Sequence, residues 1–235
     1  MKTYPRWQYD ETHLVGVDYI DIAHVQAYDE QMERLRDSKK VAQDIIAALG
    51  ITNDGVILEL GTGTGSFAVE AANHCAKVIA VDISPTMLDY AEKKAVANGV
   101  KNIEFHSGGF LTYEHSGDPV DAVVSQLALH HLPDFWKIIA LKKVAGMLKP
   151  GGRMFLRDVV YSFNVGEYAK AFNEWLEEIE GIAGIEAAID TETAIREEYA
   201  TLGWIMEGLL SRAGFTVEES YYDSKFIAAY VCSKG

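Results

Sequence analysis

The sequence predicts a doubly wound α/β fold with a mostly parallel sheet of seven strands, of which the last is antiparallel. Three observations predict it. Between about residues 51 and 160, short apolar runs alternate with helix-length segments, as in parallel βαβ units whose sheet is covered on both faces. Two further apolar runs near the C-terminus are separated by the short polar link 223–225, which favours an antiparallel pair. Helical patterns flank the alternating block, so we expect a helical N-terminal cap and a helical insertion before the last two strands.

The expected elements follow in chain order. Apolar residues recur at helical spacing between residues 41 and 49, and Gly50 favours a helix end there. The insertion carries two more helical patterns, which end at Gly214. Strands are expected at the apolar runs 56–60, 78–82, 103–105, 122–125, 153–158, 215–219 and 226–231.

The chain length and composition favour one domain. The 235 residues are 49% hydrophobic, which is enough for a three-layer core, and no linker rich in Pro, Gly or Ser divides the sequence. We expect four parts: a helical cap or lid at 1–50, a cofactor-binding core at 51–160, a helical insertion that forms the substrate pocket at 161–212, and a C-terminal hairpin at 213–235.

The charge and cysteine content argue against several kinds of partner. A net charge of −14 without a basic patch would repel a nucleic-acid backbone. Cys75 and Cys232 form no CxxC motif or Cys/His cluster, and no carboxylate/His spacing indicates a metal site, so we expect buried free thiols and no metal. No apolar run is long enough to cross a bilayer, and the polar, aromatic N-terminal segment does not match a signal peptide. We therefore expect a cytoplasmic protein without membrane contact.

The strongest chemical signal is the glycine-rich segment ELGTGTGS at 59–66, directly after a predicted strand and before a helical pattern. Glycines let the backbone turn tightly and approach a ligand closely. Asp82 ends the next strand, 17 residues beyond Gly65, where a carboxylate can accept hydrogen bonds from a ribose diol. The alternative is a tight turn without a ligand, with Asp82 as a helix cap.

The glycine spacing separates two cofactor classes. A nicotinamide enzyme would use G-x-G-x-x-G, whereas this chain has G-x-G-x-G led by Glu59. That pattern resembles the class I S-adenosylmethionine-dependent methyltransferases, which have a Rossmann-like fold. The resemblance extends from about residue 51 to 235 through VIAVDIS (78–84), DAVVSQLALHHLPD (121–134), LKPGGRMFLRD (148–158) and AGFTVEE (213–219).

The resemblance implies S-adenosyl-L-methionine as cofactor and S-adenosyl-L-homocysteine as product. Carried onto matching positions, it implies that the glycine-rich loop surrounds the methionine part, that Asp82 holds the ribose, and that residues after the fourth strand lie near the reacting methyl. One departure is Gly109, which stands where many relatives have an acid that binds the adenine amine. The implied cofactor residues are Glu59, Gly61, Thr62, Gly63, Gly65, Asp82, Ile83, Met87, Gly109, Phe110, Gln126 and Leu127.

Methyl transfer requires the protein to align a nucleophile, exclude water and, where needed, remove a proton. His130 follows the fourth strand and Asp158 ends the fifth, at the carboxyl edge where ligands gather in such sheets. We take these two as candidate catalytic residues, with helix-cap or packing roles as the alternative. The outer segments look like lids over a closed pocket, so we expect a small-molecule acceptor. The candidate residues of the substrate pocket are Tyr19, Tyr28, His131 and Tyr199.

Two other functions stay open at this point, and a protein is a lesser alternative to the small-molecule acceptor. A non-catalytic, S-adenosylmethionine-binding regulatory subunit would share the cofactor motifs. A nicotinamide-dependent oxidoreductase is disfavoured by the glycine spacing and the terminal hairpin. The sequence does not distinguish a monomer from a homodimer.

Overall fold

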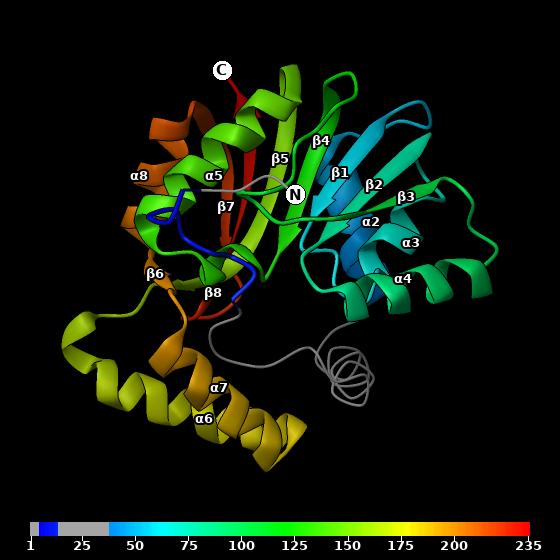
Figure 1. Ribbon diagram of the computed structural model, residues 1–235. Helices are drawn as coiled ribbons and strands as arrows, with labels where there is room; N and C mark the ends of the chain where they lie inside the picture. The colour runs from blue at the N-terminus through cyan, green and yellow to red at the C-terminus, as the bar shows by residue number, and fades with distance from the viewer. Residues whose placement is uncertain (1–4, 14–37) are drawn as a thin grey trace.

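The computed structural model describes residues 5–13 and 38–235. Its centre is one sheet, flanked by helices on both faces (Figure 1). The strands are β1 (Val56–Leu60), β2 (Lys77–Asp82), β3 (Ile103–Ser107), β4 (Val120–Gln126), β5 (Leu148–Tyr161), β6 (Thr201–Leu202), β7 (Phe215–Tyr222) and β8 (Ile227–Lys234). The helices of eight or more residues are α2 (Ser38–Leu49), α4 (Pro85–Ala97), α5 (Asp134–Met147), α6 (Tyr168–Ala183), α7 (Ile185–Glu197) and α8 (Gly203–Ala213). The short helices are α3 (Ser66–Ala71), η1 (Leu129–His131) and η2 (Val165–Glu167).

The strand order is β3-β2-β1-β4-β5-β8-β7. Pairs from β3 to β5 are parallel, whereas β8 runs antiparallel to both β5 and β7. The predicted doubly wound sheet with an antiparallel last strand is therefore confirmed. The strand β6, which pairs with the end of β5, was not predicted, because two residues are too short to show a period.

The apolar strand runs arise because both faces of the sheet are buried. Ile57 and Leu58 are adjacent and each has 0% exposure, yet they belong to two different core clusters. Successive strand residues point to opposite faces, so a strand covered on both sides needs no polar alternation. At the sheet edge, β3 is mostly exposed, which explains why its apolar run is short.

The segments around the core position the site. Ser84 caps the N-terminus of helix α4, because its hydroxyl accepts a hydrogen bond from Met87 N. Pro85 is the first residue of the helix, where proline is favoured. Helices α6 and α7 project as a pair from the edge at which β5 ends (Figure 1). Of the expected N-terminal cap, the structure describes only residues 5–13 and α2, so Tyr19 and Tyr28 lie outside the described residues.

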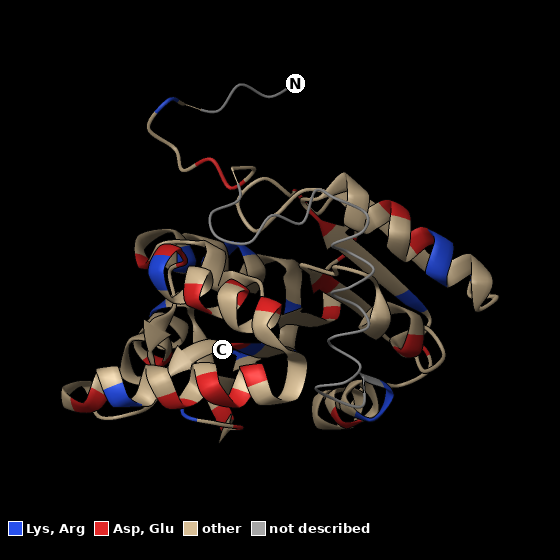
Figure 2. Cartoon of the chain, turned by 90° about the horizontal axis from the view of Figure 1, so that it is seen from below, with Lys and Arg blue, Asp and Glu red and all other residues tan. Residues whose placement is uncertain are grey.

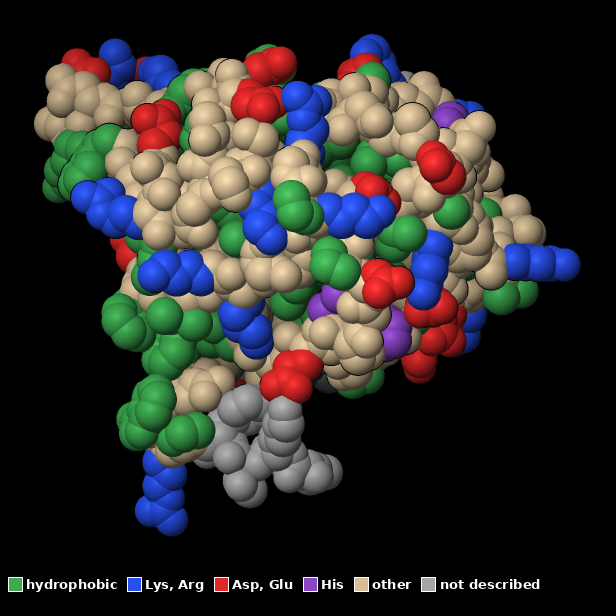
Figure 3. All heavy atoms as spheres, turned by 90° about the horizontal axis from the view of Figure 1, so that it is seen from above, with side chains coloured by type: hydrophobic (Ala, Val, Ile, Leu, Met, Phe, Trp, Pro, Cys, Tyr) green, Lys and Arg blue, Asp and Glu red, His purple; other side chains and the backbone are tan. Residues whose placement is uncertain are grey.

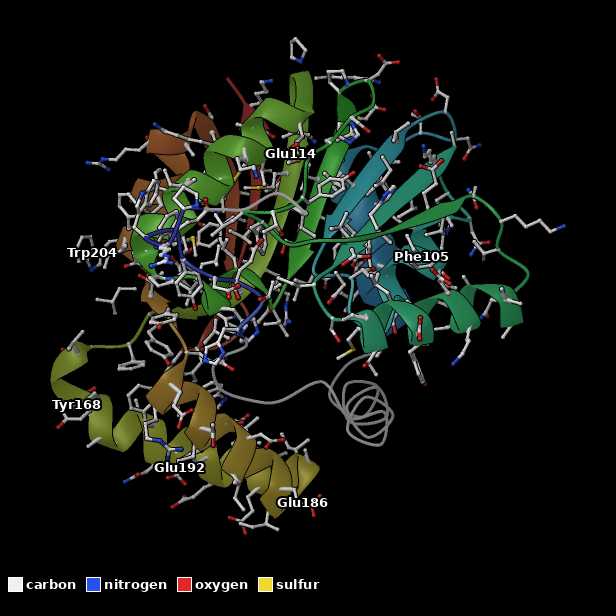
Figure 4. All side chains as sticks on the ribbon, in the orientation of Figure 1. Phe105, Glu114, Tyr168, Glu186, Glu192 and Trp204 are labelled. Carbon is white, nitrogen blue, oxygen red and sulfur yellow. The ribbon has the colours of Figure 1, made fainter. Side chains whose placement is uncertain are left out.

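The surface agrees with the acidic composition. Asp and Glu recur along the helices seen from below (Figure 2), and on the opposite face Lys and Arg are dispersed among other side chains (Figure 3). Trp204 points outward from α8 and is 72% exposed, and Tyr168 lies on the outer side of α6 (Figure 4). No helix in the described part of the chain has the length and apolar character to span a bilayer.

Candidate functional site

A pocket opens at the carboxyl ends of β1, β2 and β4. Nine of the twelve predicted cofactor residues line it; Glu59, Thr62 and Gly65 do not. The full lining is Glu11, Gly61, Gly63, Asp82, Ile83, Ser84, Met87, Gly108, Gly109, Phe110, Gln126, Leu127, Ala128, His131 and Leu132. The structure thus brings together residues from four separate segments that the sequence assigned to one site, and adds a fifth at Glu11.

The glycine-rich turn after β1 needs glycine for both conformation and space. Gly61 has φ +76°, and a Cβ there would lie 2.4 Å from the Cβ of Ala128. Gly65 has φ +77°, and a Cβ there would lie 2.7 Å from the Cβ of Ala91. Below the turn, the buried Glu59 carboxylate accepts a 2.5 Å hydrogen bond from the Thr62 hydroxyl. Glu59, Thr62 and Gly65 therefore shape the turn from behind the pocket wall.

Asp82 connects this turn to the next βα unit. One carboxylate oxygen accepts from Gly63 N at 2.7 Å and the other accepts from Ser84 N at 2.8 Å. Burial raises the pKa of Asp82, against these backbone hydrogen bonds, which lower it. Each carboxylate oxygen has a second lone pair, so the group can accept further hydrogen bonds from a ligand in the pocket.

Glu11 is a pocket residue that the sequence did not reveal. The residue is 9% exposed, and its carboxylate accepts hydrogen bonds from Leu111 N at 3.0 Å, Thr112 N at 2.7 Å and the Thr112 hydroxyl at 2.6 Å. A Cβ on Gly109 would lie 2.6 Å from this carboxyl group. The carboxylate of Glu11 therefore occupies the space next to Gly109 where a side chain would begin. The one available signal in the sequence was that Gly109 stands where many relatives have an acid. This signal did not indicate that Glu11, about 100 positions away, supplies a carboxylate there.

Leu127 carries the backbone strain of the site. It has φ +52° and is the single non-glycine residue with positive φ among those that the structure describes. Such a conformation costs about 1–3 kcal/mol and persists where the surroundings impose it. Leu127 N donates a 2.7 Å hydrogen bond to Arg157 O, which turns the chain away from β4 at the pocket wall.

The two predicted histidines differ in exposure and partners. His130 does not line the pocket; its Nδ1 lies 2.5 Å from Asp158 Oδ1 and its Nε2 lies 3.2 Å from Glu198 Oε2. Burial opposes a charged His130, but the carboxylates of Asp158 and Glu198 outweigh it and raise its pKa. His131 lines the pocket, and burial together with the adjacent His130 lowers the pKa of His131.

Segments distant in sequence hold this histidine pair in place. Tyr199 N donates to His130 O at 2.9 Å, and the Tyr9 hydroxyl donates to His131 O at 3.2 Å. The Tyr9 ring meets the Tyr199 ring edge-on, with centroids 6.2 Å apart. The fully buried Lys137 donates to Tyr199 O. Tyr199 supports η1 but does not line the pocket, so its predicted contact with substrate stays a prediction.

Comparisons with known proteins agree with this architecture. Residues 57–152 match a family model described as a methyltransferase domain. An uncharacterised methyltransferase of Geobacillus kaustophilus is 30% identical over 192 residues, which cover 82% of each chain. Two solved structures share the fold at lower identity. An S-adenosylmethionine-dependent methyltransferase of Clostridium acetobutylicum has a TM-score of 0.67 at 15% identity and covers 91% of this chain and 97% of its own. One from Aquifex aeolicus has a TM-score of 0.62 at 20% identity, with coverages of 92% and 99%.

Proposed function

Because the chain belongs to the class I S-adenosylmethionine-dependent methyltransferases, we propose that its pocket binds S-adenosyl-L-methionine and that it methylates a small-molecule nucleophile by in-line displacement. One observation carries the proposal. Gly63 N donates a 2.7 Å hydrogen bond to the Asp82 carboxylate, so the glycine-rich turn and a carboxylate lie together in one pocket. The turn offers close backbone approach, and the carboxylate offers lone pairs to a ribose.

The lining fits the different parts of this cofactor. Gly61 and Gly63 would face the methionine portion and Asp82 the ribose hydroxyls. Ile83, Met87 and Phe110 offer apolar surface for the adenine ring, and the Glu11 carboxylate beside Gly109 offers an acceptor for its amine. We assign Glu11 the part of the acid that relatives place after the third strand.

Gln126, the last residue of β4, and Leu127 after it line the same pocket as His131, and we place the reacting methyl near them. When bound, the cofactor would supply an electrophilic methyl group, whose carbon–sulfur bond breaks as the acceptor attacks, leaving S-adenosyl-L-homocysteine. The protein would align the acceptor and exclude water. His131 is the histidine that faces the pocket. Direct catalytic roles for His130 and Asp158 stay predictions; their burial favours a positioning role.

The small-molecule acceptor is supported by how the outer segments close on the site. Tyr9, from the N-terminal segment, packs against Trp136 of α5 and against Tyr199, which follows α7 in the helical insertion. Glu198 of the same insertion contacts both histidines. Such a covered site suits a compact acceptor better than a polymer.

Calorimetric titration with S-adenosyl-L-methionine tests the proposal. The wild type should bind, and Asp82→Ala should weaken binding at least tenfold, whereas Asp89→Ala on the exposed face of α4 is the matched control. A folded wild type that does not bind at millimolar cofactor would refute it. Incubation of metabolite extracts with methyl-labelled cofactor then tests transfer. Binding without transfer to any acceptor would favour the regulatory subunit, and binding of NADH instead would favour the oxidoreductase.

A further inference from the structure

Four ionisable side chains from three parts of the fold meet beside the pocket. His130 and His131 lie in η1, after β4; Asp158 lies in β5; and Glu198 follows the last residue of α7. The side chains of His130, Asp158 and Glu198 are 8%, 0% and 5% exposed, and that of His131 is 24% exposed. Glu198 is 67 or more positions from the histidines, so sequence spacing gave no indication that it joins this cluster.

The cluster leaves polar atoms unsatisfied. His131 Nδ1 and Asp158 Oδ2 are buried and have no hydrogen-bond partner among the residues that the structure describes. His131 Nδ1 points toward Glu198, with 3.8 Å between Nδ1 and Oε1, which is too long for a hydrogen bond. A buried nitrogen lone pair without a donor is costly, and a bound cation is one way to satisfy it.

The arrangement has the geometry of a metal-binding site. One atom each from His130, His131 and Glu198 can be chosen so that all three lie within 4.8 Å of one another. The 3.2 Å from His130 Nε2 to the Glu198 carboxylate is close to the separation of about 3.4 Å between two ligands that each lie about 2.1 Å from a tetrahedral ion. His131 Nδ1 lies 3.8 Å from the Glu198 carboxylate, so the three groups would draw closer together around a bound ion.

His130 also has the carboxylate partner that a metal-binding histidine commonly has. The opposite nitrogen of His130 lies 2.5 Å from Asp158 Oδ1. Histidines that bind metals commonly donate their other ring N–H to a carboxylate, which fixes the tautomer and leaves the ligating nitrogen unprotonated.

We propose that His130 Nε2, His131 Nδ1 and the Glu198 carboxylate bind one divalent transition-metal cation of the zinc class, with Asp158 orienting His130. Two imidazoles and one carboxylate are the ligand types that such ions prefer. This proposal revises the expectation from sequence that the protein binds no metal. It goes beyond the proposed function, because metal binding requires neither cofactor nor acceptor.

The metal would connect two parts of the molecule. Glu198 caps the end of α7 in the helical insertion, and His131 is part of the pocket wall. A bound ion would therefore fix the insertion against η1. Three protein ligands leave at least one coordination position for water or for an oxygen of the acceptor.

Cobalt titration tests the proposal, because Co²⁺ replaces Zn²⁺ and absorbs visible light. Tag-free, chelator-treated protein without added cofactor should bind one Co²⁺ per chain and develop a visible absorption band. Glu198→Gln should weaken Co²⁺ binding at least tenfold, and Asp158→Asn should weaken it about 10- to 100-fold. Glu197→Gln, on the exposed neighbour, should bind as the wild type does. Circular dichroism of each variant checks folding.

The result that would overturn the proposal is wild-type protein with no visible band at millimolar Co²⁺, or Glu198→Gln binding Co²⁺ as tightly as the wild type. If Glu198→Gln does not fold, His131→Gln at the partly exposed ligand replaces it, with the same expected loss. Calorimetry with S-adenosyl-L-methionine on the metal-free protein keeps the two proposals separate. Cofactor binding is measured without the metal, and Co²⁺ binding is measured without the cofactor, so failure of one proposal leaves the other testable.

Discussion

Replacing Glu11 by Ala tests whether the N-terminal segment supplies the acid that is missing at Gly109. The substitution removes a carboxylate that accepts hydrogen bonds from Leu111 N, Thr112 N and the Thr112 hydroxyl. If the same carboxylate also accepts a hydrogen bond from the adenine amine, its loss removes a charge-assisted hydrogen bond of about 1.5–3 kcal/mol. That corresponds to about 10- to 150-fold weaker binding of S-adenosyl-L-methionine.

The assay separates this contact from a general loosening of the loop. Calorimetry would compare adenosine, which has the amine, with inosine, which has a carbonyl oxygen in its place, as ligands for the wild type and for Glu11→Ala. The wild type should prefer adenosine, and the variant should lose most of that preference. Asp10→Asn is the matched control, because Asp10 is exposed in the same segment. An unchanged preference for adenosine in the variant would refute the assignment of Glu11.

The remaining predictions concern the same loop, the turn after β1 and the core. Gly109→Asp alone should weaken cofactor binding, because its Cβ would lie 2.6 Å from the Glu11 carboxyl group. The double variant with Glu11→Ala should recover binding in calorimetry. A double variant that binds the cofactor no better than either single variant would contradict this. Gly61→Ala should abolish measurable cofactor binding and destabilise the fold more than Gly63→Ala. The reason is that a Cβ at Gly61 would lie 2.4 Å from the Cβ of Ala128, whereas a Cβ at Gly63 would meet no atom within 4 Å. Equal urea midpoints for the two variants would contradict this prediction. Leu58→Ala, at 0% exposure, should lower the free energy of unfolding by about 2–5 kcal/mol in urea titration, and a loss below about 1 kcal/mol would contradict the two-sided packing of β1.

The core of the fold could be predicted because it depends on local patterns. A strand covered on both faces contains a run of consecutive apolar residues, as in β1 (VIL), β2 (VIAV) and β4 (AVV). The glycine turn and Asp82 could be predicted for a related reason: each follows a strand directly, and carboxyl ends of neighbouring parallel strands meet at one edge. Nine predicted cofactor residues consequently line one pocket.

The parts that were missed depend on contacts between distant segments. Glu11 is an ordinary acid in a polar stretch, and only the folded chain brings its carboxylate beside Gly109. Glu198 belongs to a charged helical segment that, in sequence, is indistinguishable from a solvated face, yet its side chain is 5% exposed against His130. Tertiary packing, rather than local sequence, determines the role of both acids.

A crystal structure of the protein with S-adenosyl-L-homocysteine tests the central claim most directly. The account predicts that the adenosine lies in the pocket between the turn at Gly61–Gly63 and Phe110, with both ribose hydroxyls within hydrogen-bond distance of Asp82. Clear density for the ligand at another place, or an empty pocket in crystals grown at saturating ligand, would contradict it.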